Sequence, residues 1–140
     1  MSDLAPVRLL GVDFGRKNIG LAVMDLATGL PRPLKPLSAS GTLNKDAVAL
    51  VQAMKKNDAQ GMVIGLPLDA NGDTKMSRVV RQLADKCCEL DVDVWLVDES
   101  LTSQEAEANL SRLGLTAAGI RARVDSEAAC QILLRYTHGS

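Results

Sequence analysis

Apolar and polar positions change along the chain in a pattern that predicts strands first and helices later. Two apolar segments, 7–14 (VRLLGVDF) and 19–25 (IGLAVMD), predict strands, and the short link Gly15–Asn18 indicates that they form an antiparallel hairpin. A third strand is expected within 31–40, where three prolines favour the edge of a sheet. The first forty residues therefore predict a three-stranded meander.

Helical spacing begins after this meander. Apolar positions of 44–57 lie on one stripe with Asn44 as the expected cap, and those of 74–90 repeat in the same way. Two short apolar segments, 61–65 and 92–98, predict buried strands between and after these helices. Strands that alternate with helices are expected to run parallel to the first strand.

The C-terminal part predicts two more helices. One is expected over 102–113, opened by the capping-box pair Thr102 and Glu105, and the other over 125–136. The predicted fold class is therefore α/β: a mixed five-stranded sheet with helices on both faces. We expect a single domain spanning 1–140.

Composition narrows the range of functions. The chain has 140 residues, 16 Lys+Arg against 17 Asp+Glu and a net charge of −1, which excludes binding of nucleic acid through bulk positive charge alone. Phe14, Trp95 and Tyr136 are the aromatic residues, too few for a series of base-stacking platforms. Three cysteines with Cys87 next to Cys88 fit no disulfide framework or zinc spacing, so reduced thiols are expected. With no visible signal peptide or membrane-length apolar run, we expect a cytoplasmic protein without a membrane partner.

Acidic residues stand at unusual positions in these apolar elements. Asp13 lies inside the first strand, Asp98 and Glu99 end the fifth, and Asp125 opens the last helix on its inward stripe. Asp13, Glu99 and Asp125 could converge at the carboxyl edge of the parallel strands, where ligands tend to bind. A cluster of carboxylates suits Mg²⁺ or Mn²⁺, and two such ions can activate a water for phosphodiester hydrolysis.

Ordinary roles compete with this hypothesis. An Asp at a helix start is commonly a cap, and acidic residues at strand ends are commonly solvated. Spacing alone does not choose between Asp98 and Glu99, which are adjacent and point to opposite faces. Cations that could contact a phosphate backbone, or simply face water, occur at the hairpin tip, in the long helix and before Asp125: Arg16, Lys17, Lys75, Arg78, Arg81, Arg121 and Arg123.

Four blocks in chain order now identify a family: GVDFGRKNIGLAV, VIGLPLDANG, VDESLTSQEAE and VDSEAACQILLRY. With them, the chain from about Leu9 to Tyr136 resembles the YqgF/RuvX family of ribonuclease H-like proteins, whose members are named as Holliday junction resolvases and pre-16S rRNA nucleases. The resemblance implies a ribonuclease H-like fold. It also implies a catalytic, metal-binding set that selects Glu99 over Asp98: Asp13, Glu99 and Asp125.

The resemblance also marks basic positions and departures. Lys17 matches a basic position of the first motif, while Arg16 stands where the family usually has Thr. Ser100 stands where Arg is usual, which removes a phosphate contact or a partner for a carboxylate. Arg16, Lys17, Arg121 and Arg123 are the candidate nucleic-acid contacts.

Several functions stay open at this point. The first is a metal-dependent nuclease for structured RNA, with maturation of the 5′ end of the 16S rRNA precursor and a possible ribosome association as the implied role. The second is resolution of four-way DNA junctions, whose two symmetric cuts need a dimer, so the chain is expected as a monomer or homodimer. The third is a non-catalytic module that binds nucleic acid or the ribosome. A fourth, one lobe of an actin-like or sugar-kinase ATPase, needs a second lobe that 140 residues do not supply.

Overall fold

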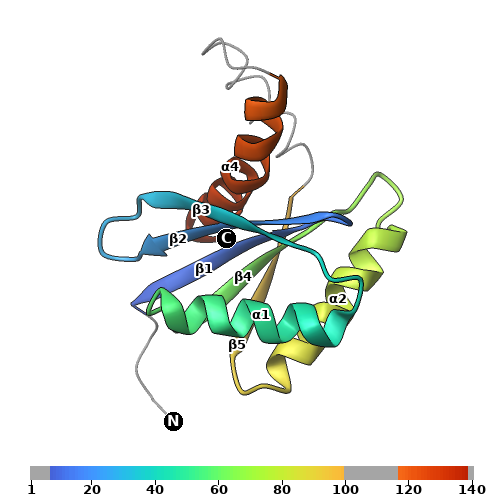
Figure 1. Ribbon diagram of the computed structural model, residues 1–140, viewed down its shortest axis with the longest axis horizontal. Coiled ribbons are helices and arrows are strands. Elements are labelled where there is room, and N and C mark those ends of the chain that lie inside the picture. Colours follow the sequence, from blue (N-terminus) through green and yellow to red (C-terminus); the bar gives the residue numbers. More distant parts are fainter. Residues whose placement is uncertain (1–6, 100–116, 139–140) are drawn as a thin grey trace.

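The fold is built on a five-stranded mixed sheet. The computed structural model describes residues 7–99 and 117–138, with the backbone alone for 117–126 and for 138. The strands lie in the order β3-β2-β1-β4-β5 (Figure 1). Their bounds are β1 Arg8–Phe14, β2 Asn18–Asp25, β3 Pro31–Ser38, β4 Gly61–Leu66 and β5 Asp93–Asp98.

Strand pairing confirms the predicted topology. β1, β2 and β3 form an antiparallel meander, and β1, β4 and β5 are paired in parallel. The proline-rich β3 lies at the edge of the sheet, where the missing N–H groups of proline interrupt no ladder on the outer side. The carboxyl ends of β1, β4 and β5 therefore share one edge of the sheet.

Helices cover both faces of this sheet. α1 (Leu43–Lys56) and α2 (Lys75–Cys88) lie on one face, and α4 (Ala117–His138) lies on the other (Figure 1). The expected cap of α1 is wrong: Thr42, not Asn44, is the N-cap, and it makes no side-chain cap hydrogen bond. The helix begins at Leu43, so Asn44 is its second residue and lies inside it.

The start of the last helix is also corrected. α4 begins at Ala117, so Asp125 lies about two turns inside the helix instead of opening it. The residues of 117–124 contain no proline, and the single Gly119 does not interrupt the helix, which extends back past Asp125. An Asp at this depth cannot be an N-cap, which removes the ordinary explanation for its presence. The helix expected over 102–113 lies outside the described residues.

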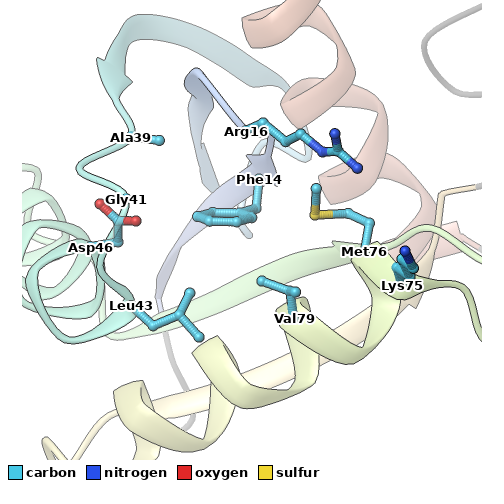
Figure 2. A pocket seen from close by; sticks show the side chains of 9 residues that line it. All are labelled: Phe14, Arg16, Ala39, Gly41, Leu43, Asp46, Lys75, Met76 and Val79. Carbon is cyan, nitrogen blue, oxygen red and sulfur yellow. The ribbon is translucent and has the colours of Figure 1, made fainter.

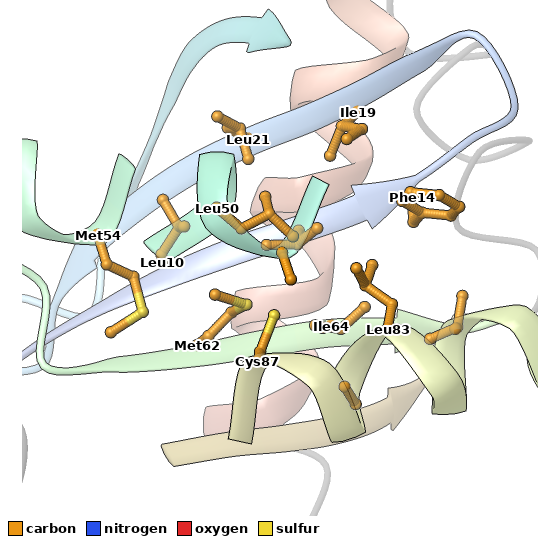
Figure 3. Packing of buried hydrophobic residues seen from close by; sticks show 14 of the residues in the cluster. Leu10, Phe14, Ile19, Leu21, Leu50, Met54, Met62, Ile64, Leu83 and Cys87 are labelled. Atoms are coloured by element: carbon orange, nitrogen blue, oxygen red, sulfur yellow. The ribbon is translucent and has the colours of Figure 1, made fainter. Parts of the chain in front are cut away.

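Side chains alternate between two hydrophobic cores. Even-numbered residues of β1 and β4, such as Leu10 and Ile64, pack with α1 and α2 (Figure 3). Odd-numbered residues, such as Leu9 and Val63, pack with Ala129, Ile132 and Leu133 of α4. This period of two fixes which face of the sheet each polar residue at the strand ends occupies.

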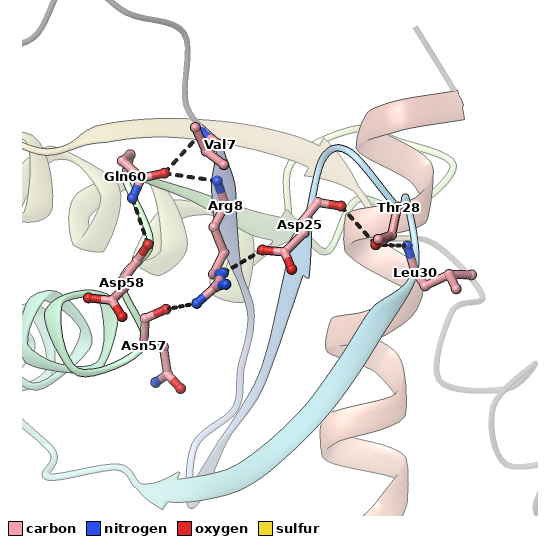
Figure 4. A network of polar contacts seen from close by, with 8 residues as sticks. All are labelled: Val7, Arg8, Asp25, Thr28, Leu30, Asn57, Asp58 and Gln60. Atoms are coloured by element: carbon pink, nitrogen blue, oxygen red, sulfur yellow. Dashed lines mark hydrogen bonds and ion pairs between the residues drawn. The ribbon is translucent and has the colours of Figure 1, made fainter.

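A polar network fastens the opposite, amino-terminal edge of the parallel strands. Arg8 forms an ion pair with Asp25 and donates a hydrogen bond to the carbonyl of Asn57 (Figure 4). The side-chain oxygen of Gln60 accepts from the backbone N–H groups of Val7 and Arg8. These contacts join the starts of β1 and β4 to the end of α1. They lie at the other end of the parallel strands from Asp13 and Glu99.

Two of the three cysteines, Cys87 and Cys130, are buried packing groups, and Cys88 is exposed. Cys87, Cys88 and Cys130 are free, and burial raises the pKa of Cys87 to about 11 and that of Cys130 to about 12. At neutral pH these two thiols are therefore protonated and unreactive.

In the part of the chain that the structure describes, no helix is both long and apolar enough to cross a membrane.

Candidate active site

Asp13 occupies the end of β1 on the face covered by α4. It is half-buried and pairs in register with Gly20 of β2. Leu9 and Asp13 share the odd-numbered face of the strand, whereas Phe14 points to the face of α1 and α2. The chain thus carries a carboxyl group into the layer between sheet and helix, at the carboxyl edge of the sheet.

Glu99 is the first residue after β5. Its backbone N–H donates to the carbonyl oxygen of Leu66 at 3.1 Å, which holds it beside the end of β4. Strand parity continues from Trp95 and Val97, which pack against the core under α4, and puts Glu99 on that face with Asp13. Asp98 is exposed. The structure therefore brings together Asp13 and Glu99, two of the three acidic residues that the family resemblance implies.

The two carboxyl groups share a proton. The pKa of Glu99 is raised to about 9, first by burial, then by the negative charge of Asp13 and a hydrogen bond with it. Asp98 raises this pKa further, and the positive charge of Arg135 opposes the shift. Two adjacent carboxylates in a desolvated site repel one another, so the pair as a whole keeps a proton to higher pH than a free carboxyl group does.

Gly65 makes room for this contact. A Cβ at position 65 would lie 2.6 Å from Oε2 of Glu99 and 2.5 Å from Cδ1 of Ile132. Any side chain here would push the Glu99 carboxyl off the surface of β4 and away from Asp13. Sequence reasoning missed this role, because a glycine at the start of a loop is equally explained by turn chemistry.

A second glycine lets α4 approach β1. A Cβ at Gly11 would lie 2.7 Å from the carbonyl oxygen of Ala129 and 2.6 Å from Cγ of Leu133. Position 125 is one helical turn, about 6 Å along the axis, before Ala129 and on the same side of α4. The backbone of the third predicted acidic residue therefore lies within one turn of the tightest contact between α4 and β1.

The predicted basic residues do not form one group. Arg16 is exposed at the hairpin tip and lines a pocket on the face of α1 and α2. Lys17 is exposed, and its backbone carbonyl accepts from Ala39. Arg121 and Arg123 lie in α4, but their side chains, like that of Asp125, fall outside the described residues. The cation that the structure does place near Glu99 is Arg135, which sequence reasoning did not single out.

The donor set fits a divalent cation. Asp13 and Glu99 supply hard oxygen ligands, and a bound cation would relieve the repulsion between their charges that contributes to the raised pKa of Glu99. Within residues 7–99 and the described side chains of α4, no three acidic, His or Cys side chains come together. Two carboxylates are fewer ligands than a divalent cation takes, so a bound ion would need further ligands beyond this pair.

Comparison with known proteins decides the family. The family model described as "RuvX: Holliday junction resolvase" matches residues 7–138. The chain belongs to the RuvX family. RuvX relatives include a protein of Anaeromyxobacter sp. (strain Fw109-5) named "Putative pre-16S rRNA nuclease", 36% identical over 135 residues that cover 95% of this chain and 98% of the relative. A Rickettsia typhi protein of the same name is 33% identical and covers 89% of this chain and 81% of its own.

Solved structures show that this chain shares its fold with nucleases. Thermus thermophilus RuvC in complex with a Holliday junction substrate has a TM-score of 0.58 at 13% identity, covering 96% of this chain and 97% of RuvC. The large terminase nuclease of the thermophilic phage G20c has a TM-score of 0.54 at 16% identity, covering 89% and 81%. At these identities the likeness concerns the fold, and it confirms the expected ribonuclease H-like architecture.

Proposed function

We propose that this protein is a divalent-metal-dependent nuclease that hydrolyses phosphodiester bonds in structured nucleic acid. Its proposed role is maturation of the 5′ end of the 16S rRNA precursor in the cytoplasm. The observation that carries the proposal is the proton-sharing pair Asp13 and Glu99, held over Gly65 at the carboxyl edge of the sheet. Relatives that match almost the whole chain carry the corresponding nuclease name.

The proposed catalytic and metal-binding residues are Asp13, Glu99 and Asp125, which would hold two ions of Mg²⁺ or Mn²⁺. Bound ions of this kind lower the pKa of a water and stabilise the leaving oxygen of a phosphodiester. Glu99 must release its proton for the site to load, and the positive charge of Arg135 favours that ionised form. Arg16, Lys17, Arg121 and Arg123 are proposed to contact backbone phosphates of the substrate.

A second function has support from the comparisons. The matching family model is described as a Holliday junction resolvase, and RuvC with a junction substrate shares the fold. Resolution of a four-way junction by this chain would use the same carboxylates but needs two sites related by symmetry. We favour the RNA role because the relatives with substantial sequence identity carry the rRNA nuclease name.

A parallel cleavage assay tests both functions. A labelled 5′ region of the 16S rRNA precursor and a four-way DNA junction are each incubated with Mn²⁺, Mg²⁺ or EDTA. We expect metal-dependent cutting of the RNA, reduced at least about a hundredfold in Asp13→Asn and in Asp125→Asn. Asp85→Asn, which removes an exposed carboxylate on α2, is the matched control and should cut as wild type.

Three other outcomes have distinct meanings. Cutting of the junction alone, by a dimer, would replace the rRNA role with resolution. Binding of either substrate without cutting would indicate a non-catalytic module. Full activity of Asp13→Asn with Mg²⁺ would contradict the assignment of the carboxyl pair.

A further inference from the structure

A pocket of about 430 Å³ opens on the face of the sheet opposite the carboxyl pair (Figure 2). It begins where β1 ends, since Phe14 follows Asp13 directly and Arg16 lies on the hairpin tip. The segment after β3 and the first turns of α1 and α2 form its other walls. The pocket and the carboxyl pair therefore flank the same strand end, one on each face.

The lining separates into chemically different parts. Phe14, Met76 and Val79 give the pocket an apolar wall, and Phe14 itself is 8% exposed (Figure 2). Arg16 and Lys75, both exposed, lie toward the same end of the pocket, on either side of Met76. The pocket thus offers an apolar wall and two cations, which suit a flat ligand that carries an anionic charge.

Asp46 forms the opposite end of the pocket (Figure 2). Only 2% of this residue is exposed, and its Oδ1 accepts from the backbone N–H of Ser40 at 2.9 Å. Among the described residues, no donor is found for its Oδ2. A buried carboxylate oxygen without a donor is unfavourable, so the pocket presents a strong acceptor that a ligand N–H can satisfy.

We propose that this pocket binds one unpaired nucleotide of the substrate strand. The base would pack against the apolar wall, and one of its N–H groups would donate to Asp46. The phosphate would lie at Arg16 and Lys75. The volume falls within the range of small-molecule sites, roughly 300–1,000 Å³. The inference rests on the proposed nuclease function and adds a specificity: the enzyme selects a site with an unpaired base beside the cut.

This inference agrees with the small number of aromatic residues. Proteins that bind long single strands line up several stacking platforms, which this chain lacks. A single pocket beside the carboxyl pair needs no such series. The pocket would bind the base at one position of a structured nucleic acid. All other contacts with the substrate would be made to its backbone phosphates.

Binding measured without metal tests the pocket separately from cleavage. The ¹⁵N-labelled full-length protein is titrated in EDTA with a single-stranded RNA pentamer, the same pentamer paired in a duplex, GMP, guanosine and inorganic phosphate. We expect the single strand to shift the amide signals of the pocket walls, such as those of Ala39, Gly41 and Val79. The duplex should shift them at least about tenfold more weakly, because its bases are not free to enter the pocket.

Charge and shape variants give the decisive comparison. Lys75→Ala should weaken binding of the pentamer about tenfold, whereas Arg78→Ala, the same loss of charge on α2 but outside the pocket, should leave it unchanged. Asp46→Asn keeps an acceptor for Ser40 but removes the charge, and should weaken the pentamer and GMP about equally. Equal losses in Lys75→Ala and Arg78→Ala, or shifts centred elsewhere, would overturn the proposal.

Two further results separate this inference from its alternatives. GMP binding as tight as that of the pentamer would assign the pocket to a free nucleotide and overturn its role in substrate recognition. Normal RNA cutting by Asp13→Asn, together with pocket binding by the wild type, would show that the proposed catalytic pair is wrong while the pocket stands. Metal-dependent cutting by the wild type without shifts of the pocket amides would overturn the pocket and leave the proposed nuclease function in place.

Discussion

Gly65 determines how closely the Glu99 carboxyl can approach Asp13. Replacing Gly65 with Ala puts a methyl group 2.6 Å from Oε2 of Glu99, so the carboxyl must move. We expect Gly65→Ala to lower cleavage and metal affinity at least about tenfold, since a ligand displaced by about 1 Å no longer fits the site. Metal-dependent cleavage rates measure this directly.

Gly61→Ala is the matched control for that variant. Gly61 lies on the same strand and face, and its added Cβ would lie 2.5 Å from the ring of Trp95, far from the carboxyl pair. Both variants should lose about 1–3 kcal/mol of unfolding free energy through overpacking. Only Gly65→Ala should lose activity beyond what its stability explains; equal activity losses in both would contradict the role assigned to Gly65.

The shared proton gives the metal-free protein a defined pH dependence. The pKa of Glu99 is raised from 4.5 to about 9 in the folded state, so the native protein holds one more proton than the unfolded chain between these values. Its unfolding free energy therefore falls as pH rises through that window. Glu99→Gln removes the ionisable group and should increase the unfolding free energy near pH 9 by about 1–3 kcal/mol, with little effect near pH 4.

Urea unfolding in EDTA across this pH range measures the Glu99 effect. The wild type and Glu99→Gln should diverge as pH rises. Parallel curves would show that Glu99 ionises normally in the folded protein. Added Mn²⁺ should reduce the divergence, because the cation takes the place of the shared proton.

At the scale of elements, the N-terminus of α2 fixes the loop that follows β4. The Thr74 side chain accepts from the backbone N–H of Ser77 at 3.0 Å and donates to the carbonyl of Pro67 at 2.8 Å. The Ser77 hydroxyl also accepts from the Thr74 backbone N–H, which completes a capping box. One side chain thus joins the helix to the loop between the carboxyl pair and the pocket.

Removal of this cap should destabilise the fold measurably. We expect Thr74→Ala to lower the unfolding free energy by about 1–2 kcal/mol, because it leaves helix N–H groups and the Pro67 carbonyl without their partner. Thr74→Ser keeps the hydroxyl and should recover most of the loss. Urea unfolding compares the three proteins, and equal losses in both variants would show that the hydroxyl is not the stabilising group.

Periodicity in the sequence predicted the elements well and their ends less well. The apolar alternation of β1 and β4 and the prolines of β3 specify strands and an edge position through local chemistry alone. The start of α4 was misplaced because Asp125 resembles a cap, and only the extent of the helix shows that it lies inside. The cap of α1 was predicted at Asn44 instead of Thr42, because both Asn and Thr are common N-cap residues.

At the scale of the whole molecule, the sheet separates two kinds of chemistry along one edge. The carboxyl pair lies under α4, and the nucleotide-sized pocket lies between α1 and α2 and the end of β1. Parity of the strands explains the division: consecutive residues Asp13 and Phe14 point to opposite faces. A nucleic acid that crosses the edge would meet both sites.

The sequence predicted some residues of the site but not the contacts between them. Asp13 stood out because Asp is rare inside strands, and the family resemblance selected Glu99. The closeness of Gly65 to Glu99, the charge of Arg135 beside it and the buried acceptor of Asp46 depend on contacts between residues far apart in the chain. No local pattern carries that information.

Localisation of a bound cation is the most direct test of a divalent-metal site at Asp13 and Glu99. Mn²⁺ is titrated into the ¹⁵N-labelled protein, and its paramagnetic broadening of amide signals is mapped at low occupancy. We expect broadening centred on Asp13, Gly65 and Glu99. It should be absent at the opposite edge around Asn57 and lost in Asp13→Asn. Broadening centred on another part of the chain, or a pattern that Asp13→Asn leaves unchanged, would contradict a metal site at this carboxyl pair.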